Sequence, residues 1–174
     1  MDRMTRTAIV DALEALAVEL ASAEEQCDLI VVGGAALVLL YGARESTKDV
    51  DAFTAKPVAS LRAAAVRIAE SQSLPPDWLN DAAKGYVHGF SSGPILLQRP
   101  ALTVRTLALE QLLAMKLSAW RDDLDIQDAQ LLLSKVHGSQ DEIWARVEPH
   151  VVPGREMKAR YAFEDLWEAG YATR

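Results

Sequence analysis

DLIVVGGAALVLLYGARESTKDVDAFT, residues 28–54, is the stretch of sequence that decides the fold. Its first five residues, 28–32, are mostly apolar and β-branched, which predicts a short buried strand. Gly33 and Gly34 end that strand. The apolar run 35–41 that follows predicts a short buried helix beginning directly after the glycines. A strand, a glycine turn and a buried helix therefore open the predicted core.

Two aspartates, Asp49 and Asp51, stand in residues 49–54, where polar and apolar side chains alternate as in a half-buried strand. Residues two apart in a strand point to the same side, so both carboxylates are expected on one face. Two such like charges are costly unless a cation lies between them, and Mg²⁺ typically binds one or two carboxylates and completes its shell with phosphates. Gly33 and Gly34 add a helix N-terminus that favours anions. Each pattern alone is common, but together they indicate phosphoryl chemistry.

The rest of the chain extends this core. Prolines and glycines between residues 75 and 94 indicate turns. Further helices are expected at about 5–25, 57–71, 109–121, 125–136, 140–148 and 154–170, and further strands at 95–98 and 102–106. The expected fold class is α/β (α+β), with a small mixed β-sheet core and flanking helices in about 5–107. A helical C-terminal part, about 108–174, completes a single domain of 174 residues.

Composition excludes several classes of function. The net charge is −7 and no long basic run exists, so broad electrostatic attraction to nucleic acid is not expected. The three histidines His88, His137 and His150 follow no metal-ligand spacing, which argues against zinc. The single cysteine, Cys27, forms no intramolecular disulfide, as in a cytoplasmic protein. The longest uncharged run, 29–43, is shorter than the roughly 20 residues of a membrane span, so no membrane partner is expected.

The chain also resembles a known family. Gly33-Gly34, about a dozen residues and then Asp49-Val50-Asp51 resemble the first motif of the DNA polymerase β-like nucleotidyltransferases. The additional residues that are similar to the AbiE-type toxin nucleotidyltransferases and their small uncharacterised relatives are Ala35, Ala36, Tyr41, Gly42, Arg44 and Thr47. A second stretch, 112–119 with 125–132, resembles the helical K-L-x-A … D-x-x-D-L segment of those proteins. Trp78-Leu79-Asn80-Asp81 is similar to a further motif of the small relatives.

The resemblance, which covers about residues 28–133, implies transfer of a nucleoside monophosphate from a nucleoside triphosphate to an acceptor hydroxyl, with two Mg²⁺ ions held by Asp49 and Asp51. It implies a catalytic set of Asp49, Asp51, Lys116 and Asp128 and a nucleotide-binding set of Gly33, Gly34, Arg44, Thr47 and Lys116. In this set Lys116 faces the triphosphate, and Asp128 acts as general base or supports Lys116. Asp125 is an alternative to Asp128, three residues away on the same helical face.

Several alternatives stay open. The predicted strand 102–106 lacks the third carboxylate usual in polymerase β-like enzymes, as the AbiE-type pattern also does. A Rossmann unit requires Gly-x-Gly-x-x-Gly and a P-loop requires Gly-Lys-Ser/Thr, and the spacing after Gly33 fits neither. A catalytically silent, antitoxin-like binding module on the same fold is the main rival to an enzyme. The sequence leaves open the triphosphate, an RNA, transfer RNA or protein acceptor, a cognate toxin or antitoxin partner, a homodimer, and whether Asp81 joins the site.

Overall fold

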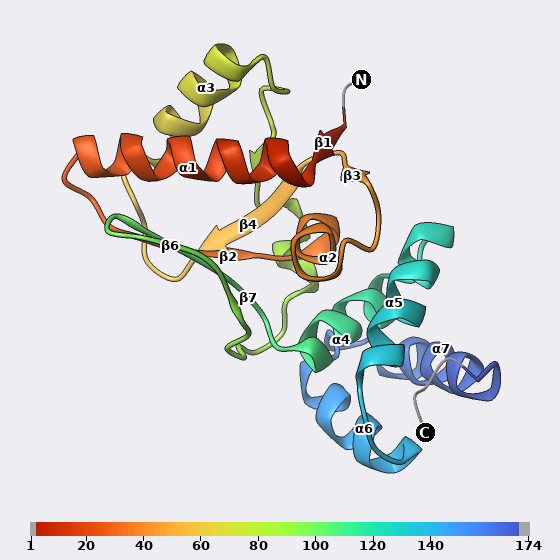
Figure 1. Ribbon diagram of the computed structural model, residues 1–174. Helices are drawn as coiled ribbons and strands as arrows, with labels where there is room; N and C mark the ends of the chain where they lie inside the picture. The colour runs from red at the N-terminus through yellow and green to blue at the C-terminus, as the bar shows by residue number, and fades with distance from the viewer. Residues whose placement is uncertain (1–2, 171–174) are drawn as a thin grey trace. The chain divides into compact units, whose positions relative to one another are not determined.

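The computed structural model describes residues 3–170, which form two compact units (Figure 1). The first unit runs up to Lys84 and also includes Pro94–Thr106. The second unit comprises Gly85–Gly93 and the chain from Leu107 onward. The chain therefore leaves the first unit after Lys84, returns to it at Pro94 and leaves it again after Thr106. Whether the whole chain folds as one domain, as its length predicts, stays a prediction.

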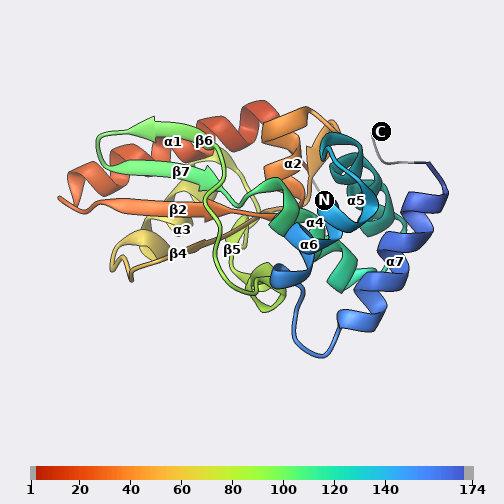
Figure 2. The ribbon, with the colours of Figure 1, turned by 90° about the horizontal axis from the view of Figure 1, so that it is seen from below.

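A five-stranded mixed sheet forms the centre of the first unit, in the order β5-β4-β2-β7-β6 (Figure 2). Its strands are β2 (Cys27–Val31), β4 (Val50–Thr54), β5 (Leu79–Asn80), β6 (Ile95–Arg99) and β7 (Leu102–Thr106). The central strand β2 runs parallel to β7 and antiparallel to β4, and β4 runs parallel to β5. The central position of β2 explains its continuous apolar sequence, because Leu29, Ile30 and Val31 are all buried.

Two helices of the first unit pack against each other, and the longer one also contacts β7 of the sheet (Figure 1). The longer, α1 (Arg6–Ser22), buries the expected apolar stripe that includes Ile9, Leu13 and Leu16. The shorter, α3 (Leu61–Gln72), begins later than the predicted start at Pro57. The reason lies in Glu25, whose carboxylate accepts hydrogen bonds from the backbone N–H of Ala59 (3.2 Å) and of Ser60 (2.9 Å). These bonds hold the residues before Leu61 as a loop.

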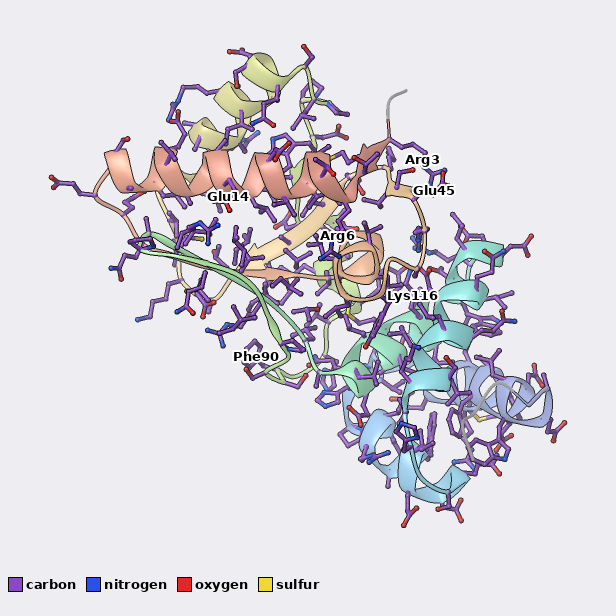
Figure 3. The ribbon with its side chains drawn as sticks, in the orientation of Figure 1. Arg3, Arg6, Glu14, Glu45, Phe90 and Lys116 are labelled. Atoms are coloured by element: carbon purple, nitrogen blue, oxygen red, sulfur yellow. The ribbon has the colours of Figure 1, made fainter. Side chains whose placement is uncertain are left out.

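A second, two-stranded sheet lies at the N-terminal end of α1 and was not predicted. It pairs β1 (Met4–Thr5) with β3 (Ser46–Thr47) in antiparallel register, with Met4 opposite Thr47. Arg6, the first residue of α1, donates hydrogen bonds to the carbonyl oxygens of Val38 (3.2 Å) and Leu39, which belong to the helix that follows β2 (Figure 3). The N-terminal segment therefore contacts both the helix that follows the glycine turn and the strand β3 that comes after it.

The second unit is helical. Its helices are α4 (Leu109–Ala119), α5 (Asp123–Lys135), α6 (Gln140–Val147) and α7 (Glu156–Glu168), with α4 packed against the other three. The buried Gln111 of α4 anchors the segment Gly85–Gly93. Its side chain accepts from the backbone N–H of Ser91 (2.8 Å) and donates to the carbonyl oxygens of His88 (3.0 Å) and Gly89 (3.1 Å). These bonds explain why a segment that precedes β6 belongs to the helical unit.

The architecture confirms the predicted fold class: a mixed sheet with flanking helices, followed by a helical C-terminal part. The predicted strands 28–32, 49–54, 95–98 and 102–106 each agree with an observed strand to within one residue at either end. The predictions missed the two-residue strands β1, β3 and β5, which exist only through their pairing with distant residues. Within residues 3–170, no helix is both long enough and apolar enough to cross a membrane.

Candidate active site

The glycine turn after β2 begins the helix α2 (Gly33–Tyr41). Gly33 has a φ of +63°, a left-handed backbone conformation that favours glycine. The residue before it, Val32, provides no side-chain hydrogen bond to the first turn of the helix. The N–H groups of that turn and the helix dipole therefore make this terminus suitable for an anion. At the other end, Gly42 stops the helix with a φ of +57°, as its position predicts.

Space for a side chain is also limited at both glycines, most of all at Gly34. A Cβ atom on Gly33 would lie 3.1 Å from Oδ2 of Asp51. A Cβ atom on Gly34 would lie 2.6 Å from Oγ1 of Thr47 and 3.4 Å from a guanidinium nitrogen of Arg44. The turn is thus surrounded by a carboxylate, a hydroxyl and a guanidinium. Backbone N–H groups, a hydroxyl and a guanidinium are the groups that bind phosphate in proteins.

The two aspartates lie at the start of β4, next to the turn. The strand begins at Val50, so Asp49 immediately precedes it and Asp51 is its second residue. The carbonyl oxygen of Asp51 accepts a hydrogen bond from the backbone N–H of Val32 (2.9 Å), which fixes β4 beside the residue that enters the glycine turn. The pairing between β2 and β4 therefore holds Asp51 beside the N-terminus of α2.

A second set of contacts comes from Asn80, the last residue of β5, and from the residues that follow it. The side-chain amide of Asn80 donates to Oδ2 of Asp49 at 3.1 Å, and the backbone N–H of Ala83 donates to Oδ1 of Asp51 at 3.1 Å. The parallel pairing of β4 with β5 aligns Asp51 with Asn80 and so brings this segment to the aspartates. One short segment therefore contacts both carboxylates.

The residues at this place fit Mg²⁺. Asp49 and Asp51 are half-buried and offer hard carboxylate oxygens beside a helix N-terminus suited to phosphate. In the described part of the chain, no group of three or more His, Cys, Asp or Glu side chains is arranged to hold a metal ion. A carboxylate pair matches the way Mg²⁺ binds with substrate, because phosphate oxygens and water supply its remaining ligands.

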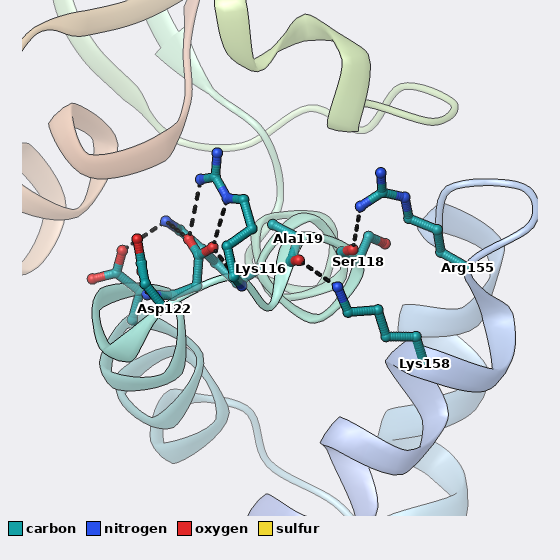
Figure 4. A network of polar contacts seen from close by, with 9 residues as sticks. Lys116, Ser118, Ala119, Asp122, Arg155 and Lys158 are labelled. Carbon is teal, nitrogen blue, oxygen red and sulfur yellow. Dashed lines mark hydrogen bonds and ion pairs between the residues drawn. The ribbon is translucent and has the colours of Figure 1, made fainter.

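The second unit contains a buried cluster of charges centred on Lys116 (Figure 4). The ammonium group of Lys116 in α4 lies 2.9 Å from Oδ1 of Asp125 and 2.8 Å from Oδ2 of Asp128, both in α5. The Lys116 side chain is 14% exposed, which rules out a lysine on a solvated helix surface. Arg121 donates from Nε to Oδ2 of Asp125 at 3.0 Å. Lys116 thus joins α4 to α5 through two carboxylates, and Arg121, an exposed residue between the two helices, adds a second cation.

The contacts in this cluster shift the pKa of two groups. Burial acts to raise the pKa of Asp125, but hydrogen bonds from Arg121 and Lys116 outweigh it and lower that pKa from 3.8 to about 2. The hydrogen bond to Asp125 in turn raises the pKa of Arg121 above its ordinary value. Both shifts favour the charged forms, so Asp125 is a strongly held carboxylate at neutral pH.

The structure brings the predicted residues together in two groups, one in each unit. The group in the first unit consists of Gly33, Gly34, Arg44, Thr47, Asp49 and Asp51. The group in the second unit consists of Lys116, Asp125 and Asp128. Lys116 contacts both aspartates that the sequence offered as alternatives.

Sequence reasoning did not assign a role to Asn80 or to Arg121. The resemblance of residues 78–81 to a motif of the small relatives was the available signal for Asn80, the only asparagine in the chain. The neighbouring Asp81 is exposed, and its carbonyl oxygen accepts from the backbone N–H of Lys84. For Arg121, the i, i+4 spacing to Asp125 was visible in the sequence.

Comparison with known proteins gives one match. A family described as nucleotidyltransferase of unknown function (DUF6036) matches residues 8–139, about three quarters of the chain. This range includes the glycine turn, the aspartate pair and the Lys116 cluster, and it ends just before α6. No curated protein and no solved structure matches the chain.

Proposed function

The chain belongs to the DUF6036 family of nucleotidyltransferases, and on that premise we propose that it transfers a nucleoside monophosphate from a nucleoside triphosphate to an acceptor hydroxyl with the help of Mg²⁺. The observation that carries this proposal is the contact of each glycine with a functional side chain. Gly33 lies against the Asp51 carboxylate, and Gly34 lies against the Thr47 hydroxyl. A phosphate-binding turn and a metal-binding carboxylate therefore share one place.

Each candidate site residue of the first unit has a defined role in the proposed reaction. The N–H groups at the start of α2 bind phosphate oxygens of the triphosphate, with the helix dipole adding to the attraction. Arg44 and Thr47 flank the same turn and hold the phosphates from the side. Asp49 and Asp51 hold the ions. When bound, Mg²⁺ lowers the pKa of the acceptor hydroxyl and neutralises charge on the leaving pyrophosphate.

The parts of Lys116 and Asp128 in this reaction are proposed from the sequence resemblance alone. In that role Lys116 stabilises charge on the triphosphate, and Asp128 acts as general base or orients Lys116. The proposal also includes an RNA, transfer RNA or protein acceptor, a place in a toxin–antitoxin pair of the AbiE-like kind, and association of two copies of the chain.

One observation favours a second candidate function, a catalytically silent module that binds nucleotide or a partner. Lys116 is already neutralised by Asp125 and Asp128 at hydrogen-bonding distance. A lysine held in this way stabilises the packing of α4 on α5 without any substrate. The two candidate functions differ in whether the nucleoside monophosphate is transferred from the triphosphate to an acceptor.

Label transfer tests the proposal directly. The protein is incubated with Mg²⁺, each α-labelled nucleoside triphosphate, and pooled RNA or pooled protein in separate reactions. We expect transfer by the wild type, loss of at least about a hundredfold in Asp49→Asn/Asp51→Asn because the metal ligands are removed, and no change in Asp11→Asn, an exposed aspartate of α1. An Asp81→Asn variant tests whether Asp81 takes part.

The other outcomes separate the candidates. Mg²⁺-dependent binding of the triphosphate without transfer supports the silent module. Transfer that survives in Asp49→Asn/Asp51→Asn, or the absence of both transfer and Mg²⁺-dependent binding, overturns the site.

A further inference from the structure

Asn80 is held on both sides of its amide group. Its Nδ2 donates to Oδ2 of Asp49 (3.1 Å) and to the carbonyl oxygen of Asp77 (3.2 Å), while its Oδ1 accepts from the backbone N–H of Ala82 (2.9 Å). The partners settle the orientation of the amide, because two acceptors face the nitrogen and one donor faces the oxygen. Asn80 therefore presents a hydrogen-bond donor to the Asp49 carboxylate.

The contact to Ala82 on its own has a simple structural explanation. A side-chain oxygen that accepts from the N–H two residues later forms an Asx-turn, which asparagine and aspartate form equally well. The contact to Asp49 is different, since only a side chain with a hydrogen-bond donor can make it. An asparagine satisfies both requirements at this position and an aspartate satisfies one.

We infer that Asn80 is a positioning residue that fixes the Asp49 carboxylate for binding of the metal ion, an inference that rests on the function proposed above. The residues that follow it support the same role, because the backbone N–H of Ala83 holds Asp51 at 3.1 Å. The turn from Asn80 to Ala83 thus orients both carboxylates from one side. Groups that orient metal ligands through hydrogen bonds commonly change metal affinity tenfold or more when they are removed.

Two substitutions at this position separate positioning from a purely structural role. Asn80→Ala removes the donor, so we expect binding of Mn²⁺, used as a probe for Mg²⁺, to weaken about tenfold. Asn80→Asp keeps the Asx-turn acceptor and places a third carboxylate beside Asp49. Because affinity for hard cations rises with the number of ligand charges, we expect Mn²⁺ binding to tighten about five- to tenfold. A purely structural asparagine would leave the Mn²⁺ affinity of a folded Asn80→Ala unchanged, because its donor to Asp49 would then not matter for metal binding.

Gln98→Glu is the matched control for the added charge. Gln98 is exposed in β6, the edge strand farthest from β5 in the same sheet. Three strand spacings of roughly 4.8 Å separate β6 from β4, so a charge at residue 98 is largely screened by salt. We expect the Mn²⁺ affinity of this variant to lie within about twofold of the wild-type affinity, because the added charge is exposed and remote from the site.

The measurement is titration of Mn²⁺ followed by electron paramagnetic resonance of the free ion, with circular dichroism to verify folding. Equal affinity in wild type and Asn80→Ala, or an unchanged affinity in Asn80→Asp, overturns the positioning role. If Asn80→Ala fails to fold, Asn80→Ser takes its place, because it keeps a side-chain acceptor for the turn and removes the amide donor. If Asp49→Asn loses Mn²⁺ binding and neither Asn80 variant changes it, the positioning role of Asn80 is overturned and the proposed metal site is retained. A wild-type protein that binds no Mn²⁺ overturns the proposed metal site as well.

Discussion

Gly34 and Thr47 lie in such close contact that a single added methyl group would not fit between them: a Cβ atom on Gly34 would stand 2.6 Å from Thr47 Oγ1. These residues come from different elements, α2 and β3, which approach each other at this point. The hydroxyl of Thr47 is thereby fixed beside the first turn of the helix, and Thr47 itself is buried. The glycine thus sets the distance between two parts of the candidate phosphate site.

We expect Gly34→Ala to lower the free energy of unfolding by about 1–3 kcal/mol, because the added methyl group forces Thr47 or the backbone to move. Adding Thr47→Ala should recover part of this loss, since the clashing oxygen is then absent. Gly85→Ala is the control, as a Cβ there would meet nothing within 4 Å. Urea denaturation measures all four proteins. Equal losses of unfolding free energy in Gly34→Ala and Gly85→Ala would show that the close contact with Thr47 does not restrict the side chain at residue 34.

We expect Lys116→Met to destabilise the protein by about 3–5 kcal/mol, because it leaves Asp125 and Asp128 buried without the cation between them. Adding Asp128→Asn should restore part of the stability by removing one of the two charges. The matched control is Lys158→Met: Lys158 is an exposed lysine whose ammonium group donates to the carbonyl oxygen of Ala119 (2.8 Å). Its loss should cost about 1 kcal/mol. Urea unfolding at pH 7 gives the comparison, and similar losses from the two lysines would contradict it.

Asp125 should make stability depend on pH in the acid range. Its folded pKa of about 2 lies below its ordinary value of 3.8, so its contribution is full above about pH 4 and is lost as the pH falls toward 2. The size of this contribution is about 2 kcal/mol, of which roughly half is gone by pH 3. Urea unfolding of wild type and Asp125→Asn between pH 3 and pH 7 should show a stability difference that is constant above pH 5 and narrows below pH 4. A difference independent of pH would contradict the lowered pKa.

Arg6 and Arg3 offer a matched pair at the N-terminal end of α1 (Figure 3). Arg6 binds the carbonyl oxygens of Val38 and Leu39 near the C-terminal end of α2, where a positive charge also complements the helix dipole. We expect Arg6→Met to cost about 1–2 kcal/mol of unfolding free energy. Arg3→Met, at an exposed position before β1, should change it by less than about 0.5 kcal/mol. Thermal or urea unfolding distinguishes them, and a reversed order would refute the assigned contact.

The sequence allowed prediction of those elements whose signal is local. The apolar run of β2, the glycines that follow it and the alternation around Asp51 each depend on neighbouring residues, and the structure has all three. The start of α3 depends instead on Glu25, which lies 35 residues before Ser60. Periodicity within the helix carries no information about such a contact, so the predicted start at Pro57 was wrong.

The candidate site shows the same division. The aspartate pair and the glycines were found from spacing and resemblance, but the donor to Asp49 comes from Asn80, 31 residues away. That contact exists because β5 pairs with β4, and a two-residue strand leaves no periodic pattern. In the second unit, the spacing of Asp125 and Asp128 predicted that they share one helical face. The structure agrees with this prediction, since Lys116 contacts both carboxylates. Asp125 and Asp128 are therefore both partners of Lys116, and neither excludes the other.

The path of the chain also has a consequence for recombination and truncation. Because Gly85–Gly93 belongs to the helical unit but precedes β6 and β7, no single cut separates the two units. A fragment ending at Thr106 would keep the whole five-stranded sheet. It would lack Gln111, however, whose side chain forms hydrogen bonds with His88, Gly89 and Ser91. Exchange of the helical unit between relatives therefore requires three simultaneous crossovers, after Lys84, Gly93 and Thr106, so the sheet and the helices are expected to be inherited as one piece.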